Sequence, residues 1–239
     1  MSIEVRNLVK KFDDKAVIDD ISFKVADGEI LAIVGFSGSG KSTVLKLICG
    51  LIPYDNGQVL TSEGDIAMVF QYSALFDSLN VYDNISFALH ERKDLRSKYT
   101  EEEIKEIVSQ KLELVGLKGI ENKFPSELSG GMQKRVSFAR AIVTKPNTIL
   151  YDEPTAGLDP MSSTLIEDYI VRLKRETNAA SIVVTHQMST ITRTADRVIM
   201  LYDGKIVFEG TPSELLKQDN PYTKQFVTAS LDGPMKMKA

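Results

Sequence analysis

The stretch GFSGSGKS, from Gly35 to Ser42, constrains the fold of this chain more than any other part of the sequence. It fits the pattern GxxxxGK[ST] and follows the apolar run ILAIV, which predicts a strand, while the next residues predict a helix up to about Gly50. In that context glycines let backbone N–H groups turn inward around phosphates, Lys41 reaches the same oxygens, and the Ser42 hydroxyl can hold Mg²⁺. The stretch therefore predicts a site for a nucleoside triphosphate.

Polar residues at the ends of later strand-like runs fit the same site. TILYD ends in Asp152 and is followed at once by Glu153. A parallel strand would bring Asp152 beside the metal, and the turn after it lets Glu153 approach as well, to orient or deprotonate an attacking water. The run SIVVTH would carry His186 toward the γ-phosphate, and Gln71, at the end of AMVFQ, could contact Mg²⁺ or the water.

The bulk composition argues against several classes of protein. The 239 residues carry 29 basic and 33 acidic side chains, a net charge of −4, so we expect no nucleic-acid partner. The single cysteine, Cys49, excludes an intrachain disulfide and a Cys-rich metal site. The first residues lack the apolar core of a secretory signal, and no apolar run approaches the ~20 residues that cross a bilayer. We therefore expect a cytosolic chain whose membrane role comes from a partner.

The periodicity of the apolar residues predicts an α/β core interrupted by a helical lobe. Within residues 3–33, ISFKVADGEILAIVG predicts two strands joined at Asp27-Gly28. Helical spacing dominates from about residue 72 to residue 144, where Thr100 and Glu103 form a capping-box pattern. Strand–helix alternation then resumes.

The C-terminal residues lack the apolar periodicity of the rest of the chain. From Asn220 the last twenty residues are polar and predict an irregular segment, either disordered or docked on a partner. We therefore expect one domain over residues 1–219 and a tail over residues 220–239.

A second stretch of the sequence predicts an anion-binding site. In LSGGMQKR, residues 128–135, a serine and two glycines open a predicted helix. The first N–H groups of a helix have no internal partner and carry the positive end of its dipole. One chain thus carries two phosphate cradles.

Together these motifs resemble the ATP-binding-cassette (ABC) family across nearly the whole chain. The glycine loop, Gln71, LSGGMQ, YDEP, AGLD and His186 follow one another in that family's order. The resemblance implies an α/β P-loop NTPase fold of the ABC ATPase type, with a mixed-sheet core, an antiparallel β-lobe and an inserted helical lobe. It also implies binding of ATP and Mg²⁺, and a second copy of the chain whose nucleotide is closed over by Ser129, Gly130 and Gly131.

The resemblance also assigns roles to single residues. It implies that nucleotide is bound by Phe12, Val17, Gly35, Phe36, Ser37, Gly38, Ser39, Gly40, Lys41, Ser42, Thr43, Ser129, Gly130, Gly131, Gln133 and Asp159. It implies that catalysis uses Lys41, Gln71, Glu153 and His186, and that the metal is held by Ser42, Gln71 and Asp152. Phe12, explained equally well by packing on its own, would stack on adenine, and Asp159 would communicate across the dimer. Residues 72–84 would grip the coupling helix of a membrane subunit.

A finer resemblance concerns the transported cargo. SALFDSLNVYDNISFAL and FPSELSGGMQKRVSFARAI are similar to the ATPase subunit of Mla-type or Mce-type phospholipid transporters. That similarity implies transmembrane permease subunits, a small regulatory subunit and a lipid-binding Mce-type protein as partners, at the cytoplasmic face of the inner membrane. The chain is shorter between Gly57 and Gln71 than this family usually allows, which predicts a shortened β-lobe.

Two alternatives compete with a lipid transporter. Importers of amino acids or another polar solute share much of the second stretch, and composition does not separate them from lipid transporters. A soluble, non-transport ABC ATPase is disfavoured, because the chain carries one cassette, leaves no room for a long coiled coil between Gln71 and Ser129, and shows no basic surface.

Overall fold

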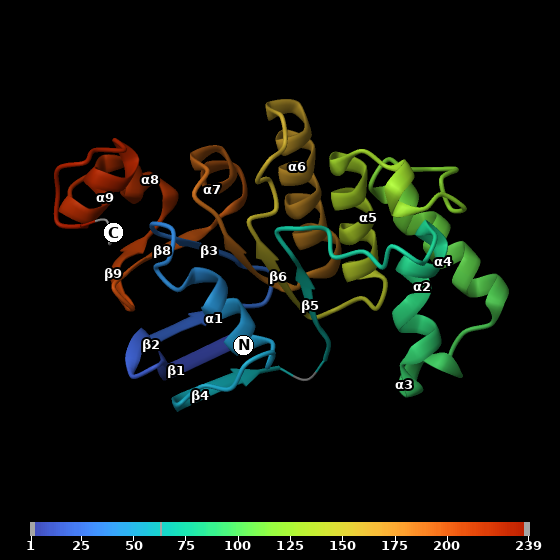
Figure 1. The fold of residues 1–239 in the computed structure, drawn as a ribbon, viewed down its shortest axis with the longest axis horizontal. Helices are drawn as coiled ribbons and strands as arrows, with labels where there is room; N and C mark the ends of the chain where they lie inside the picture. The colour runs from blue at the N-terminus through green and yellow to red at the C-terminus, as the bar shows by residue number, and fades with distance from the viewer. Residues whose placement is uncertain (1–2, 63, 237–239) are drawn as a thin grey trace.

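The computed structural model describes residues 3–62 and 64–236, which form two β-sheets and a set of helices around them (Figure 1). The larger sheet has six strands in the order β5-β6-β7-β3-β8-β9. Its strands are β3 Ile30–Val34, β5 Ile66–Val69, β6 Thr148–Asp152, β7 Ala180–Val184, β8 Arg197–Tyr202 and β9 Lys205–Gly210. All neighbours are parallel except β8 and β9. The α/β expectation with a mixed sheet is confirmed.

The central strands are apolar because both faces of the sheet are covered. Every residue of β3, β6 and β7 is buried. Alternate residues of one strand join different cores: Ile149 and Tyr151 pack with α6 Pro160–Thr177, whereas Leu150 packs with α1 Lys41–Ile48. The strands are in register at their carboxyl ends, since Ile33 and Asp152 both pair with Val184. Residues that follow β3, β6 and β7 therefore meet at one edge of the sheet.

The smaller sheet is antiparallel and lies on the other side of α1 (Figure 1). It contains β1 Ile3–Phe12, β2 Lys15–Val25 and β4 Asn56–Thr61, in the order β2-β1-β4. The two strands expected around Asp27-Gly28 are confirmed, and they belong to different sheets. Gly28 has φ +68°, and a Cβ there would lie 2.4 Å from Asn178 Oδ1, so this crossing from one sheet to the other requires glycine.

The helical region between β5 and β6 contains α2 Val81–Glu91, α3 Lys93–Arg96, α4 Glu101–Leu114, the 3₁₀ turn η1 Pro125–Glu127 and α5 Gly130–Ile142. The capping box is confirmed: Thr100 accepts from the Glu103 N–H at 3.3 Å, and the Thr100 N–H donates to Glu103 at 2.7 Å. The buried faces of α4 and α5 share one core with β6 and α6. No helix among the described residues is long and apolar enough to span a membrane.

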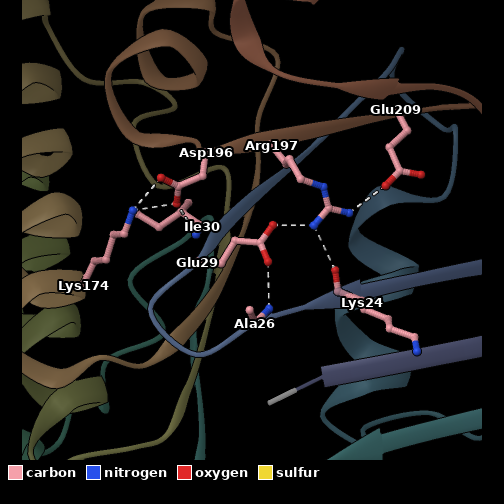
Figure 2. Close-up of polar contacts among 8 residues, drawn as sticks. All are labelled: Lys24, Ala26, Glu29, Ile30, Lys174, Asp196, Arg197 and Glu209. Atoms are coloured by element: carbon pink, nitrogen blue, oxygen red, sulfur yellow. Dashed lines mark hydrogen bonds and ion pairs between the residues drawn. The ribbon is translucent and has the colours of Figure 1, made fainter. Parts of the chain in front are cut away.

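A network of charged side chains links strands of the large sheet at the amino ends of β3 and β8, opposite the end where the glycine loop lies (Figure 2). Asp196 accepts from the Ile30 N–H at 2.7 Å and from Lys174 of α6 at 2.6 Å. Arg197 at the start of β8 donates to Glu29, and to Glu209 of β9 at 2.7 Å. These contacts align the amino ends of β3 and β8 and so help to hold their carboxyl ends in register.

The segment after residue 219 corrects the expectation of an irregular tail. After α7 Met188–Thr194 and α8 Pro212–Lys217, the chain forms α9 Pro221–Val227, which packs beside β9 (Figure 1). Gln225 then donates to the Met235 carbonyl at 2.9 Å and accepts from its N–H at 2.8 Å, and Met235 is 1% exposed. Tyr222 and Phe226 are four residues apart, which suits one face of a helix, but a single such pair within seven residues is too short a pattern to indicate a packed helix. Residues 237–239 lie outside the described part of the chain.

Candidate functional site

The glycine loop joins β3 to α1 at the carboxyl edge of the large sheet. Gly35, Gly38 and Gly40 have φ of +144°, +78° and +96°. A Cβ on Gly35 would lie 2.3 Å from the Leu201 carbonyl, and one on Gly40 would lie 2.7 Å from Ile18. Only glycine therefore suits these positions. Gly40 is also the N-cap of α1 and provides no side-chain acceptor, so the first N–H groups of the helix are left for an anion.

Lys41 places a cation inside this loop. Its side-chain nitrogen donates to the carbonyls of Gly35 and Phe36, both at 2.9 Å, and the residue is 8% exposed. Burial lowers the pKa of Lys41, while the charges of Glu153 and Asp152 act in the opposite direction. The ammonium group thus lies where phosphate oxygens would meet the loop.

Ser42 and Asp152 form the pair that suits a hard cation. The Ser42 hydroxyl donates to Asp152 Oδ1 at 2.8 Å, which joins the start of α1 to the end of β6. Mg²⁺ prefers oxygen ligands and is commonly held by one or two carboxylates together with substrate phosphates. Within residues 3–62 and 64–236 there is no cluster of three or more His, Cys, Asp or Glu that could hold a metal by itself. This donor set therefore fits a metal that is shared with a phosphorylated ligand.

Glu153 projects from a turn rather than from a strand. Its φ is +47°, its N–H donates to the Val184 carbonyl at 2.9 Å, and the residue is 9% exposed. Oε1 lies 2.9 Å from Nδ1 of His186, whereas Oε2 is buried with no hydrogen-bond partner among the described residues. A non-glycine residue with positive φ is uncommon and is often found at functional sites. The turn explains how two successive carboxylates reach one site.

A cleft of about 530 Å³ collects most of the residues predicted for the phosphates. It is lined by Val17, Gly35, Phe36, Ser37, Gly38, Gly40, Lys41, Ser42, Thr43, Gln71, Glu153, His186 and Phe226. A neighbouring cleft of about 640 Å³ includes Phe12, Val17, Ser37, Gly38 and Ser39, together with Tyr202 and Lys236. Phe12 is 46% exposed, and the Lys10 ammonium lies 5.1 Å from the centre of its ring.

Sequence reasoning missed several residues of these clefts, among them Tyr202, Phe226 and Lys236. Tyr202 ends β8, and its hydroxyl accepts from the Lys236 N–H at 2.9 Å. The other two belong to the segment that the sequence predicted to be irregular. Two signals were available: Asn220 followed by Pro221 is a helix-start pattern, and Tyr222 and Phe226 have helical spacing.

The remaining predicted residues lie elsewhere, at the starts of α5 and α6, and line neither cleft. Ser129 caps α5 by accepting from the Met132 N–H at 3.3 Å, and a Cβ on Gly130 would meet nothing within 4 Å. Asp159 caps α6 by accepting from two N–H groups at 3.0 Å each. The Gln133 amide is directed into its own chain, donating to the Pro125 carbonyl at 2.9 Å.

The glycine loop, the Lys41 ammonium and the Ser42–Asp152 pair at the carboxyl edge of a parallel sheet define a P-loop nucleoside triphosphatase fold. Comparison with known proteins makes this more specific. The family model described as ABC transporter matches residues 18–156, and the chain belongs to the ABC transporter family. It is an ATPase of that family and binds ATP.

Three individual proteins illustrate the similarity. TRIGALACTOSYLDIACYLGLYCEROL 3 of Arabidopsis thaliana is 46% identical over 98% of this chain and 75% of that protein. The intermembrane phospholipid transport system ATP-binding protein MlaF of Haemophilus influenzae is 39% identical over 99% of this chain and 94% of that protein. A dimeric structure of the ATP-binding cassette MJ0796, in a post-hydrolysis state with ADP and Pi, superposes with a TM-score of 0.79 at 29% identity, covering 88% of this chain and 98% of that one.

Importer subunits are similar as well. The sulfate/thiosulfate import ATP-binding protein CysA of Nitrosomonas europaea is 35% identical over 95% of this chain and 66% of that protein.

Proposed function

We propose that this chain is the ATP-hydrolysing subunit of a phospholipid transporter of the Mla or Mce type, and that it works as a head-to-tail dimer with ATP between the two copies. The observation that carries the proposal is the presence of two anion receptors on one chain that do not meet. The glycine loop opens onto the cleft, whereas Ser129 and Gly130 are exposed at the start of α5 and line neither cleft. The second receptor needs an anion from outside the chain.

In the proposed mechanism, the open chain first binds ATP. Backbone N–H groups of residues 35–43 surround the phosphates, and Lys41 exchanges its contacts with loop carbonyls for phosphate oxygens. Phe12 stacks on adenine beside Val17, in the neighbouring cleft, which Glu153 does not line. Mg²⁺, when bound by Ser42, Asp152 and Gln71, would offset phosphate charge. Gln71 is suited to this role because it is exposed and lines the same cleft.

Hydrolysis then depends on Glu153. Its unpartnered Oε2 accepts a proton from water as that water attacks the γ-phosphorus in line and the bond to the bridging oxygen breaks. The hydrogen bond from His186 to Oε1 holds the carboxylate in place, and Lys41 offsets charge developing on the transferred group. The left-handed backbone at Glu153 aims the side chain, which explains why the strained conformation is kept.

Dimerisation completes each site in this proposal. The N–H groups at the start of α5, with Ser129, Gly130, Gly131 and the neighbouring Gln133, close over the γ-phosphate held by the partner copy. Asp159 begins α6 beside this surface, where it communicates across the dimer. Loss of the γ-phosphate removes the bridging anion and lets the copies separate. The dimeric form of the similar MJ0796 cassette supports this arrangement.

The transport partner is proposed to dock on residues 72–84 of the helical lobe, which spans about residues 72–144. Tyr72 is 81% exposed and Phe76 is 44% exposed, and the Phe76 ring lies 4.8 Å from that of Phe87. An exposed apolar group of this kind suits a protein partner. The similarity to MlaF favours permease subunits, a small regulatory subunit and a lipid-binding Mce-type protein at the cytoplasmic face of an inner membrane.

Purification from detergent-solubilised membranes tests the proposal. We expect the tagged chain to retain a membrane-spanning companion and bound phospholipid, both identified by mass spectrometry. Tyr72→Ser should weaken capture of the companion, whereas Leu60→Ser, which alters a 45% exposed side chain on β4, should leave it unchanged.

The second candidate, an importer subunit for a polar solute, is favoured by the similarity to CysA. It predicts a membrane companion without phospholipid and with ATPase activity that rises when the polar solute and its binding protein are added. That result would show that the cargo is a polar solute rather than a lipid, and it would not affect the proposed mechanism of ATP hydrolysis.

A further inference from the structure

Lys134 is a cation that the mechanism above does not use. It lies on α5, and its ammonium group donates to the carbonyl of Pro154 at 3.4 Å and to that of Ala156 at a shorter distance. Within the described residues no carboxylate forms an ion pair with it. A half-buried ammonium held by backbone carbonyls fixes the segment that provides those carbonyls, because releasing it would leave the charge without these partners.

That segment is the turn that begins at Glu153. The Ala156 N–H donates to the Glu153 carbonyl at 3.1 Å, and the Leu158 N–H donates to the Thr155 carbonyl at 3.2 Å. Lys134 therefore holds both sides of the turn whose first residue carries the proposed base. Burial lowers the pKa of Lys134, and the negative charge of Glu153 opposes that shift, so the two groups are close enough to interact electrostatically.

The same helix begins at the second anion receptor. Lys134 follows Gly130 by four residues, which is about one helical turn or roughly 6 Å along the axis. A Cβ on Gly131 would lie 3.9 Å from Leu158 and 3.9 Å from Ser162, so the first turn of α5 already lies against the turn after Glu153 and the start of α6. One rigid element thus joins the two halves of the machinery.

We propose that Lys134 is a positioning residue that couples the two ATP sites of the dimer. By holding the carbonyls of Pro154 and Ala156, it fixes Glu153, which acts on this chain's nucleotide, relative to the Ser129–Gly131 cradle, which closes over the partner's nucleotide. When the Ser129–Gly131 cradle closes over the partner's nucleotide, Glu153 is thereby positioned at the nucleotide of its own chain. This inference rests on the proposed sandwich dimer and adds the residue that links its two sites.

Replacing Lys134 with methionine tests the coupling in the full-length chain. The change keeps the length of the side chain and removes the donor, so we expect kcat to fall roughly tenfold or more, because a misplacement of about 1 Å can cost about a hundredfold in rate. The Kd for ATP of the isolated chain should stay unchanged, since Lys134 lies outside the phosphate cleft. The Hill coefficient for ATP should fall toward about 1. Lys134→Arg, which keeps charge and donors, should restore most of kcat and the cooperativity.

Arg135→Met is the matched control. Arg135 is the next residue of α5 and also donates to backbone carbonyls, those of Val115 and Gly116 at 3.2 and 3.4 Å, but these belong to a different loop. Its loss should lower the melting temperature without changing the Hill coefficient. The proposal is overturned if Lys134→Met keeps wild-type kcat and cooperativity, or if both variants lose kcat in proportion to stability. A wild-type protein that is fully active as a monomer would instead overturn the sandwich dimer, and the coupling with it.

Discussion

Replacing Glu153 with glutamine isolates the chemical step from the binding of ATP. The amide keeps the size of the side chain and leaves an oxygen for His186, which lies 2.9 Å from Oε1 in the wild-type chain. What is lost is the second carboxylate oxygen, Oε2, which is buried with no hydrogen-bond partner among the described residues and is therefore free to take a proton. Nothing in the glycine loop changes.

The magnitude follows from that single loss. A general base typically contributes ~10²–10⁴-fold to the rate. At about 1.36 kcal/mol per decade this is roughly 3–5 kcal/mol of transition-state stabilisation. We expect kcat of Glu153→Gln to fall by that factor while the affinity for ATP is retained, because the contacts from residues 35–43 are intact. ATP should accumulate uncleaved, so the closed dimer should persist.

Phosphate release under saturating ATP measures kcat, and size-exclusion chromatography with ATP detects the trapped dimer. Glu176→Gln, at the far end of α6 where Glu176 pairs with Arg172, is the control and should behave as wild type. Normal turnover by Glu153→Gln would refute the assignment of the base. Loss of ATP binding together with turnover would show that the side chain supports the cleft rather than the chemistry.

Three further predictions address other parts of the account. Ser129→Arg should block hydrolysis yet leave ATP binding by the lone chain intact, as measured by calorimetry; a parallel loss of binding would place Ser129 in its own chain's site. Asp152→Asn should raise the Mg²⁺ concentration needed for half-maximal turnover by more than the roughly 10–100-fold typical of outer-shell groups, and an unchanged Mg²⁺ titration would contradict the metal assignment. Hydrogen bonds from Arg6 and then Lys24 lower the pKa of Glu4 from 4.5 to about 2. Its stabilising effect is thus present above pH 4.5 and lost as the pH falls toward 2, so the difference in urea midpoint between wild type and Glu4→Gln should be smaller at about pH 3.5 than at about pH 7; a difference that does not depend on pH would contradict this.

Local sequence patterns were sufficient to predict the strand, the glycine loop and the helix between Ile30 and Ile48. Each step there depends on neighbours in sequence: an apolar run buried on both faces, glycines with positive φ, and a helix start. The capping box before α4 is equally local, since Thr100 and Glu103 are three residues apart. Such features are encoded where they occur, so the sequence alone was sufficient.

Features that depend on distant contacts were not predictable in the same way. The burial of Met235 requires Gln225, and the position of Phe226 in the phosphate cleft requires the sheet to be assembled first. Lys134 is one of many lysines in a charged surface pattern, and only the fold brings the turn after Glu153 to it. The family resemblance provided the order of the motifs, but these contacts come from the packing of this particular chain.

The central claim is that each ATP pocket is made by two chains, and ATP turnover per chain as a function of chain concentration tests it most directly. Purified protein is diluted from micromolar concentrations to well below the point of self-association, which is followed by light scattering, at saturating ATP and Mg²⁺. We predict that specific activity falls with dilution in step with the dimer fraction. Constant specific activity in a preparation that is entirely monomeric would contradict the account.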